Sequence, residues 1–169
     1  MKNSILFCFL LLIPFIGKAQ DAASVIEVGS AMPAFTIVSD DGSQILSSQY
    51  EGKVILITFF ATWCPPCQLE LTEIEKVLWP KYKENNDFVL LVIGREHSDA
   101  ELLKYNEKKG FTFPLYPDKN RKIYDSFASQ FIPRAFLIDR DGNVVFETQG
   151  FDEKVFGRLL RIIDNTLVL

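Results

Sequence analysis

The sequence is poor in the features that nucleic-acid binding and metal binding usually require. Its formal net charge is −4, and no stripe of Lys and Arg interrupts this acidic balance, so nucleic acid is not an expected partner. Histidine occurs only once, at His97. A lone histidine after a predicted strand is usually a surface or capping residue and not a ligand. Beyond the N-terminus, no apolar run is long enough to predict a transmembrane helix.

The one long apolar run lies at the N-terminus. Lys2 precedes a nearly unbroken apolar stretch over residues 5–16, and Gly17-Lys18-Ala19 then places small residues where a signal peptidase reads. This pattern predicts a secretory signal peptide over residues 1–19 and a single domain over residues 20–169. The run is short for a membrane span, which disfavours the alternative of an uncleaved anchor. We therefore expect export across the cytoplasmic membrane, to the periplasm.

Cysteine is also scarce, and its placement is informative. Of the three cysteines, Cys8 lies in the predicted signal sequence, which leaves Cys64 and Cys67 for the mature domain. A disulfide across two intervening residues closes a very small loop, so it removes little entropy from the unfolded chain and stabilises a fold poorly. An exported protein with its only two cysteines in this arrangement is expected to use them for chemistry.

The rest of the chain alternates predicted strands and helices. Strands are expected at 32–37, 54–61, 88–94, 135–139 and 144–147, and helices at 65 to about 85, 99–109, 121–129 and 152 to about 165. The run 54–61 is apolar and β-branched, which is typical of a strand buried on both faces. The order β-α-β, then helical connections, then β-β-α predicts an α/β fold with a mixed central sheet and helices on both faces.

Two of these helices carry signals for an end or a bend. Ser98, with Glu101 three residues later, forms a capping-box pattern at the start of the helix 99–109, and Gly110 is placed to end that helix. Pro80 falls inside the long helix that begins at residue 65, and it should bend or restart this helix.

A Cys-x-x-Cys motif alone is ambiguous between redox chemistry and metal binding, but its context narrows the choice. Cys64 falls between a buried strand and a helix, so it is expected near the helix N-terminus, where free N–H groups and the helix dipole favour an anionic sulfur. Because the thiolate is the species that attacks disulfides, this position predicts a nucleophile. Cys67 lies one turn further along and can release a mixed disulfide by attacking Cys64. Pro65 and Pro66 have no N–H to donate to the Cys64 sulfur, so moderate activation is expected.

Three segments carry the most specific motifs. They are Phe59-Phe60-Ala61-Thr62-Trp63-Cys64-Pro65-Pro66-Cys67, then Gly29–Thr36 with Asp41-Gly42 and Gly52-Lys53, and Phe131–Asp139 with Gly142. Together they resemble the TlpA/ResA-like branch of the thioredoxin superfamily over nearly all of the mature chain. The resemblance implies a thioredoxin-like fold with an N-terminal extension and an inserted helical segment at 99–110. It also implies extracytoplasmic thiol-disulfide exchange.

The same resemblance implies which residues surround the cysteine pair. Pro133 matches the cis-proline that faces the two cysteines in this family, and the backbone of Ile132 would pair with the substrate chain. Trp63, beside the motif, is expected to contact substrate as well. Arg134 stands where the family commonly has a small polar residue, and it would put a charge near the substrate groove. The sequence leaves open whether that charge selects partners or only belongs to the surface.

Glu70 matches the glutamate that the family places three residues after the second cysteine. One helical turn from Cys67, its carboxyl is expected to approach the inner side of the pair and to exchange protons with it. Thioredoxins themselves keep a buried aspartate six residues before the first cysteine, where this chain has Thr58, which cannot act as a base near neutral pH. Thr72 replaces the usual proline after the glutamate, which leaves the depth of Glu70 open. A solvated carboxylate on the helix surface is the alternative.

These residues predict an extracytoplasmic thiol-disulfide oxidoreductase that reduces disulfides of exported proteins. No cofactor and no metal are expected. The expected partners are exported proteins with cysteine pairs and a membrane thiol protein as electron donor, and the protein is expected to be a monomer.

Two other functions are weighed against this one. A peroxiredoxin-like peroxidase needs a threonine three residues before its reactive cysteine, whereas Thr62 lies only two residues before Cys64. A thioredoxin-like copper or zinc carrier would use soft thiolates as ligands. Such carriers space their cysteines more widely and add a distal histidine, for which His97 is the only candidate.

Overall fold

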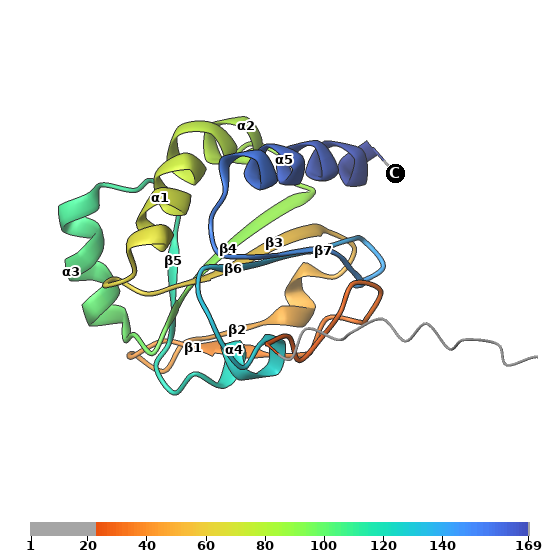
Figure 1. Ribbon diagram of the computed structural model, residues 1–169. Coiled ribbons are helices and arrows are strands. Elements are labelled where there is room, and N and C mark those ends of the chain that lie inside the picture. Colours follow the sequence, from red (N-terminus) through yellow and green to blue (C-terminus); the bar gives the residue numbers. More distant parts are fainter. Residues whose placement is uncertain (1–22, 169) are drawn as a thin grey trace, which may run out of the picture.

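The computed structural model describes residues 23–168, so the predicted signal peptide and its cleavage site lie outside the described residues. At the centre of the molecule is a five-stranded sheet with the strand order β5-β4-β3-β6-β7 (Figure 1). The strands span Val54–Phe60 (β3), Phe88–Arg95 (β4), Leu115–Asp118 (β5), Arg134–Ile138 (β6) and Val144–Gln149 (β7). β3 pairs in parallel with β4 and antiparallel with β6. The predicted mixed sheet is confirmed.

Strand β3 lies at the centre because its sequence can be buried on both faces. All seven of its residues are buried, as its unbroken apolar and β-branched run predicts. Ile57, in its middle, is in register with Leu91 of β4 on one side and with Phe136 of β6 on the other. Cys64 therefore lies just after the C-terminal end of the central strand of the sheet.

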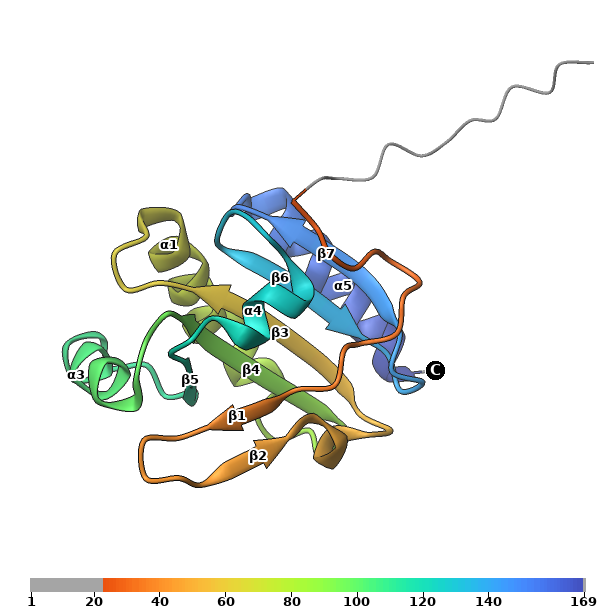
Figure 2. The same cartoon turned by 90° about the horizontal axis from the view of Figure 1, so that it is seen from below.

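The two faces of the sheet are covered by different parts of the chain (Figures 1 and 2). On one face lie α1 (Pro65–Glu73), α2 (Trp79–Tyr82) and α5 (Glu153–Val168), and on the other lie α4 (Lys122–Phe127) and the hairpin of β1 (Thr36–Val38) and β2 (Gln44–Leu46). Successive side chains of β3 join opposite cores, since Leu56 packs in the α1 and α5 core and Ile57 in the α4 core. Helices on both faces are thus confirmed, and the hairpin with the segment before it forms the expected N-terminal extension.

The long helix after the cysteine motif is interrupted, as Pro80 predicts. A π-helical turn, Ile74–Leu78, separates α1 from α2, and the N–H of Trp79 reaches back to the carbonyl of Ile74. Pro80 then occupies the first turn of α2, where its missing N–H costs least. The bend therefore lies well after Glu70, which leaves the turn carrying Cys67 and Glu70 as regular α-helix.

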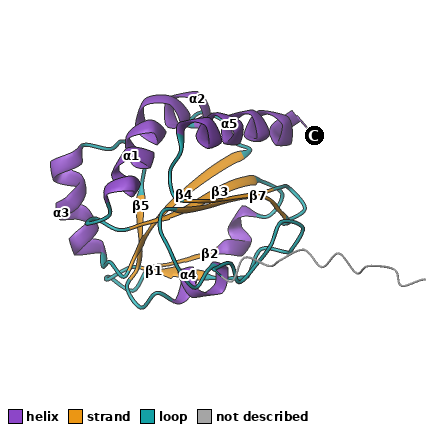
Figure 3. Cartoon of the chain, in the orientation of Figure 1, coloured by secondary structure: helices purple, strands orange, loops and turns teal. Residues whose placement is uncertain are grey.

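The inserted segment forms the helix that its capping signals predict. Helix α3 spans Asp99–Lys109, with both hydrogen bonds of the capping box between Ser98 and Glu101, and Gly110 ends it in the left-handed conformation. After this segment comes strand β5, where the sequence pattern predicts only helical connections between β4 and β6. This edge strand has four residues and contains Pro117, so it carries a weak strand pattern (Figure 3).

Candidate active site

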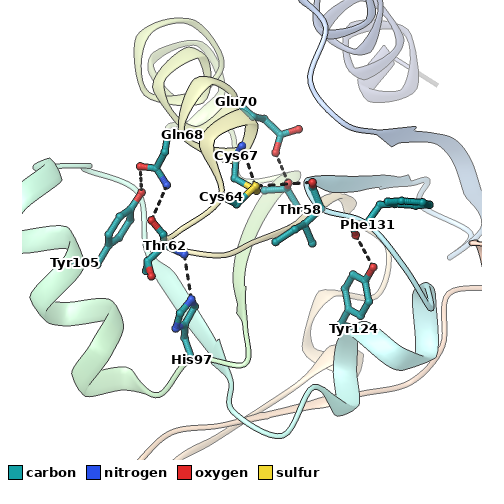
Figure 4. The surroundings of a disulfide bond; sticks show 11 residues. Thr58, Thr62, Cys64, Cys67, Gln68, Glu70, His97, Tyr105, Tyr124 and Phe131 are labelled. Atoms are coloured by element: carbon teal, nitrogen blue, oxygen red, sulfur yellow. Dashed lines mark hydrogen bonds between the residues drawn. A yellow bond between two sulfur atoms is a disulfide. The ribbon is translucent and has the colours of Figure 1, made fainter.

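The two cysteines lie at the start of α1, just after the loop that follows β3, and they form a disulfide. Their sulfurs are 2.08 Å apart and their Cα atoms 5.3 Å apart. Cys64 is the N-cap of α1, and its Sγ accepts a hydrogen bond of 3.3 Å from the N–H of Cys67 (Figure 4). Pro65 and Pro66 fill the positions between them and have no N–H, as the sequence analysis noted. In the dithiol form the same N–H and the helix N-terminus would favour a thiolate at Cys64.

The loop before β6 closes over the disulfide. The carbonyl oxygen of Ile132 lies 3.8 Å from the Sγ of Cys64. The Ile132–Pro133 peptide bond is cis, which confirms the implied cis-proline. Cys67 is fully buried and Cys64 is 3% exposed. The outer rim of the site is apolar and open to solvent, since the side chains of Trp63 and Phe131 are both more than half exposed.

Two residues that the sequence analysis did not single out support this rim. The guanidinium of Arg95, at the end of β4, lies 5.8 Å from the ring centre of Trp63 and 5.2 Å from that of Tyr124. The hydroxyl of Tyr124, on α4, donates a hydrogen bond to the carbonyl of Phe131. One cation therefore links the aromatic residue of the cysteine loop to the element that holds the cis-proline loop.

Glu70 points into the protein and not into solvent. Its residue exposure is 4%, and its Oε2 accepts a hydrogen bond of 2.6 Å from the Oγ1 of Thr58 on β3. Burial raises the pKa of Glu70 to about 7, and the hydrogen bond from Thr58 opposes this rise. The structure thus brings together the glutamate and the threonine that replaces the aspartate of thioredoxins. It excludes the alternative of a solvated carboxylate.

His97 is not the surface residue that its isolation in the sequence suggests. It is 7% exposed, and its Nε2 accepts a hydrogen bond of 3.1 Å from the N–H of Thr62 in the active-site loop. Burial lowers the pKa of His97, which favours the neutral ring that can accept this bond. On the other side of Thr62, its carbonyl accepts a hydrogen bond from Gln68, which in turn accepts one from Tyr105 of α3. The inserted helix therefore helps to fix the cysteine loop.

The expectation that Arg134 lies in the substrate groove is wrong. Arg134 is 1% exposed, and its guanidinium bonds to Glu147 and Gln149 of β7 and to Ser24 of the N-terminal segment. The reason is the pleat of β6. Side chains alternate along a strand, so Arg134 points to the α4 face of the sheet with Phe136, away from the cysteines. The N-terminal extension then covers it.

The described part of the chain contains no clustered metal donors. Within residues 23–168, no three His, Cys, Asp or Glu side chains are grouped so that they could hold a metal ion. None of the helices in this range is long and apolar enough to cross a membrane.

Known proteins are similar to this chain in sequence and in fold. The family model described as Redoxin matches residues 27–160. Thiol-disulfide oxidoreductase ResA of Bacillus thuringiensis (strain Al Hakam) is 30% identical over 76% of this chain and 73% of its own. ResA of Geobacillus kaustophilus (strain HTA426) is 32% identical over 72% and 68%. The solution structure of a candidate protein disulfide isomerase from Bacteroides thetaiotaomicron superimposes with a TM-score of 0.82 and 34% identity, covering 89% of this chain and 96% of that one.

The cysteine pair at the N-terminus of α1, the cis-proline loop against it and the agreement in sequence over most of the chain lead to one assignment. The protein belongs to the redoxin family and, within the thioredoxin superfamily, to the TlpA/ResA-like thiol-disulfide oxidoreductases.

Proposed function

We propose that this protein reduces disulfide bonds of exported proteins outside the cytoplasm, with Cys64 as nucleophile, Cys67 as resolving thiol and Glu70 as acid-base group. The observation that carries the proposal is the spacing of three buried groups, one helix turn apart, along the start of α1. Cys64 caps α1 at the rim, Cys67 is buried behind it, and Glu70 is buried one turn further with its pKa raised to about 7.

The first step is attack by the Cys64 thiolate on a client disulfide. A bond forms between the Cys64 sulfur and one client sulfur, and the other client sulfur leaves as a thiolate that takes a proton from water. The N–H of Cys67 supports the Cys64 thiolate before attack. The backbone of Ile132, whose carbonyl lies beside Cys64, offers the client chain a partner for main-chain hydrogen bonds. Trp63, at the exposed rim, offers it an apolar contact.

The second step needs a base, because Cys67 is buried and an unassisted thiol there holds its proton. Glu70 takes the proton, the Cys67 thiolate attacks the Cys64 sulfur, and the second client sulfur leaves. Two electrons pass from the dithiol to the client, and the protein is left with its disulfide and a protonated Glu70. A pKa near 7 suits a group that must accept and return a proton at neutral pH.

A pair of cysteine variants tests the division of labour. Cys67→Ser should accumulate mixed disulfides with exported client proteins, because attack at Cys64 is kept and resolution is lost. Cys64→Ser is the matched control and should trap none, and both variants should lose insulin reduction. The trapped complexes are counted on non-reducing gels and identified by mass spectrometry. If Cys64→Ser captured clients and Cys67→Ser did not, the roles would be reversed.

The site of action and the monomeric state are part of the same proposal. We expect the exported protein to begin at Gln20, since Gly17-Lys18-Ala19 fits a signal peptidase site. N-terminal sequencing of protein recovered from the periplasm checks this, and a sequence that begins at Met1 would contradict it. A membrane thiol protein would then return electrons to the Cys64–Cys67 disulfide.

The peroxidase alternative is tested by comparing two rates. If the protein reduced peroxide faster than it reduced protein disulfides, that alternative would be favoured.

A further inference from the structure

The proposed cycle leaves a proton on a buried carboxyl, and the structure contains a route by which it could leave. The buried side chain of Glu70 extends from α1 towards Thr58 of β3 (Figure 4). A small cavity of about 10 Å³ is lined by Glu70 and Thr148 together with Gly150 and Asp152. Asp152 is exposed to solvent. The cavity is therefore bordered both by the buried carboxyl and by an exposed residue at the start of α5.

Thr148 is an unexpected residue in the lining of this cavity. It lies on β7, two residues after Phe146, and both side chains are buried on the same face of the strand. An apolar side chain would suit that place, yet Thr148 puts a hydroxyl there. Its Oγ1 is buried and has no hydrogen-bond partner within residues 23–168. A buried hydroxyl without a partner costs free energy, so the position calls for one.

One carboxyl oxygen of Glu70 also lacks a hydrogen-bond partner among the described residues. Its Oε2 accepts the hydrogen bond from Thr58, while Oε1 has no partner from the part of the chain that the structure describes. A cavity of this volume is about what one water molecule requires, roughly 10–15 Å³ by the same measure, and a buried water needs two or more polar partners. The hydroxyl of Thr148 and the carboxyl of Glu70 supply two.

We propose that Thr148 is a positioning residue that holds a water molecule against Glu70, and that this water carries the proton of Glu70 to solvent beside Asp152. The inference rests on the proposed role of Glu70. In each cycle the protonated carboxyl gives its proton to the water, and the water gives one of its own protons to the next acceptor at the mouth of the cavity. Glu70 returns to the carboxylate and no electron moves. The hydroxyl of Thr148 fixes the water without being consumed.

The test compares Thr148→Val, which keeps the shape and removes the hydroxyl, with Thr148→Ser, which keeps the hydroxyl. Reduced protein is mixed with an aromatic disulfide in a stopped-flow instrument from pH 6 to 9. A first phase that depends on reagent concentration reports attack by Cys64, and a second, concentration-independent phase reports resolution by Cys67. The pKa of Glu70 is followed in parallel by the NMR signal of its carboxyl carbon.

Thr148→Val should leave the first phase unchanged and slow the second on the order of tenfold, less than the loss of the base itself. It should also raise the pKa of Glu70, because the carboxylate loses a hydrogen-bond donor. Thr148→Ser should behave as the wild type in both measurements. Urea unfolding of both variants confirms that they are folded in the assay, and a crystal structure should place a water within hydrogen-bond distance of Thr148 and Glu70.

Glu70→Gln in the same assay separates the two proposals. If Glu70→Gln slows the second phase and Thr148→Val changes neither that phase nor the pKa of Glu70, the water route is wrong and the role of Glu70 stands. If Glu70→Gln resolves at the wild-type rate, the role of Glu70 fails and the water route fails with it. A folded Thr148→Ser that is as slow as Thr148→Val would also overturn the assignment to the hydroxyl.

Discussion

Two buried charged side chains, one on each face of the sheet, differ in how the protein compensates their charge. On the α4 face, Arg134 is paired with the carboxylate of Glu147 at 3.0 Å and also bonds to Gln149 and Ser24. On the α1 face, Glu70 receives one hydrogen bond, from Thr58, and no Lys or Arg among residues 23–168 forms an ion pair with it. Both residues are less than 5% exposed.

The difference separates a structural role from a chemical one. A buried charge that is paired with an opposite charge holds the elements around it together. A buried carboxyl without a cation is driven towards its neutral form, so its pKa moves to the range where it can exchange protons. Variants that remove the ion pair on the α4 face, or the carboxyl group or its hydrogen bond on the α1 face, test this difference.

The largest effect is expected at Arg134. Arg134→Met should lower the free energy of unfolding by about 3 kcal/mol, because it leaves Glu147 without its cation and releases the N-terminal segment at Ser24. The exposed quarter of the Glu147 side chain keeps the loss at the lower end of the range for buried pairs. Denaturant unfolding measures the loss, and the folded variant should keep its rate of disulfide reduction.

Arg134→Lys is the matched control for this variant. Lysine keeps the charge but cannot reproduce the forked contacts to Glu147 and Gln149, so an intermediate loss is expected. If either variant changed the rate of disulfide reduction but not the free energy of unfolding, Arg134 would act in the substrate groove after all.

Glu70→Gln should change the pH dependence of stability in the oxidised protein. The pKa of Glu70 is raised from 4.5 in the unfolded chain to about 7 in the folded one, so the folded state holds the extra proton between these values. Its contribution is fully present below about pH 4.5 and is lost as the pH rises through 7. The free energy of unfolding of the wild type, relative to the variant, should therefore fall by about 3 kcal/mol over this window.

Urea unfolding of both oxidised proteins from pH 4 to 8 measures this difference. Burial lowers the pKa of His97, whose titration acts in the opposite direction, but it is common to both proteins and cancels in the comparison. Parallel stability curves for the wild type and Glu70→Gln would mean that Glu70 keeps an ordinary pKa.

The contrast between the two faces also shows what the sequence can and cannot predict. Strand β3 and helix α3 were predictable, because a continuous apolar run and a capping box act within a few residues. The family position of Glu70 predicted its role, but the sequence left its depth open, because its burial and its bond to Thr58 depend on how α1 packs on β3. Arg134 was misplaced because the pleat of β6 turns its side chain to the α4 face, where Ser24 of the distant N-terminal segment covers it. His97 reached the cysteine loop through a contact that no local pattern encodes.

The smallest effect is expected at Thr58, whose hydroxyl stabilises the charged form of Glu70. Its hydroxyl donates to Oε2 and so lowers the pKa of Glu70 against the rise caused by burial. Thr58→Val keeps the shape and removes the donor, so the pKa of Glu70 should rise by about one unit, since a hydrogen bond to a charged group contributes about 1.5–3 kcal/mol and part of this survives with the neutral acid. Resolution by Cys67 should then reach its maximum at a correspondingly higher pH, because the carboxylate that accepts the proton forms later. Thr58→Ser retains the hydroxyl and should match the wild type. If the NMR titration gave the same pKa for Glu70 in Thr58→Val and wild type, burial alone would set the pKa on this face, and Thr58 would only fill space beneath the helix.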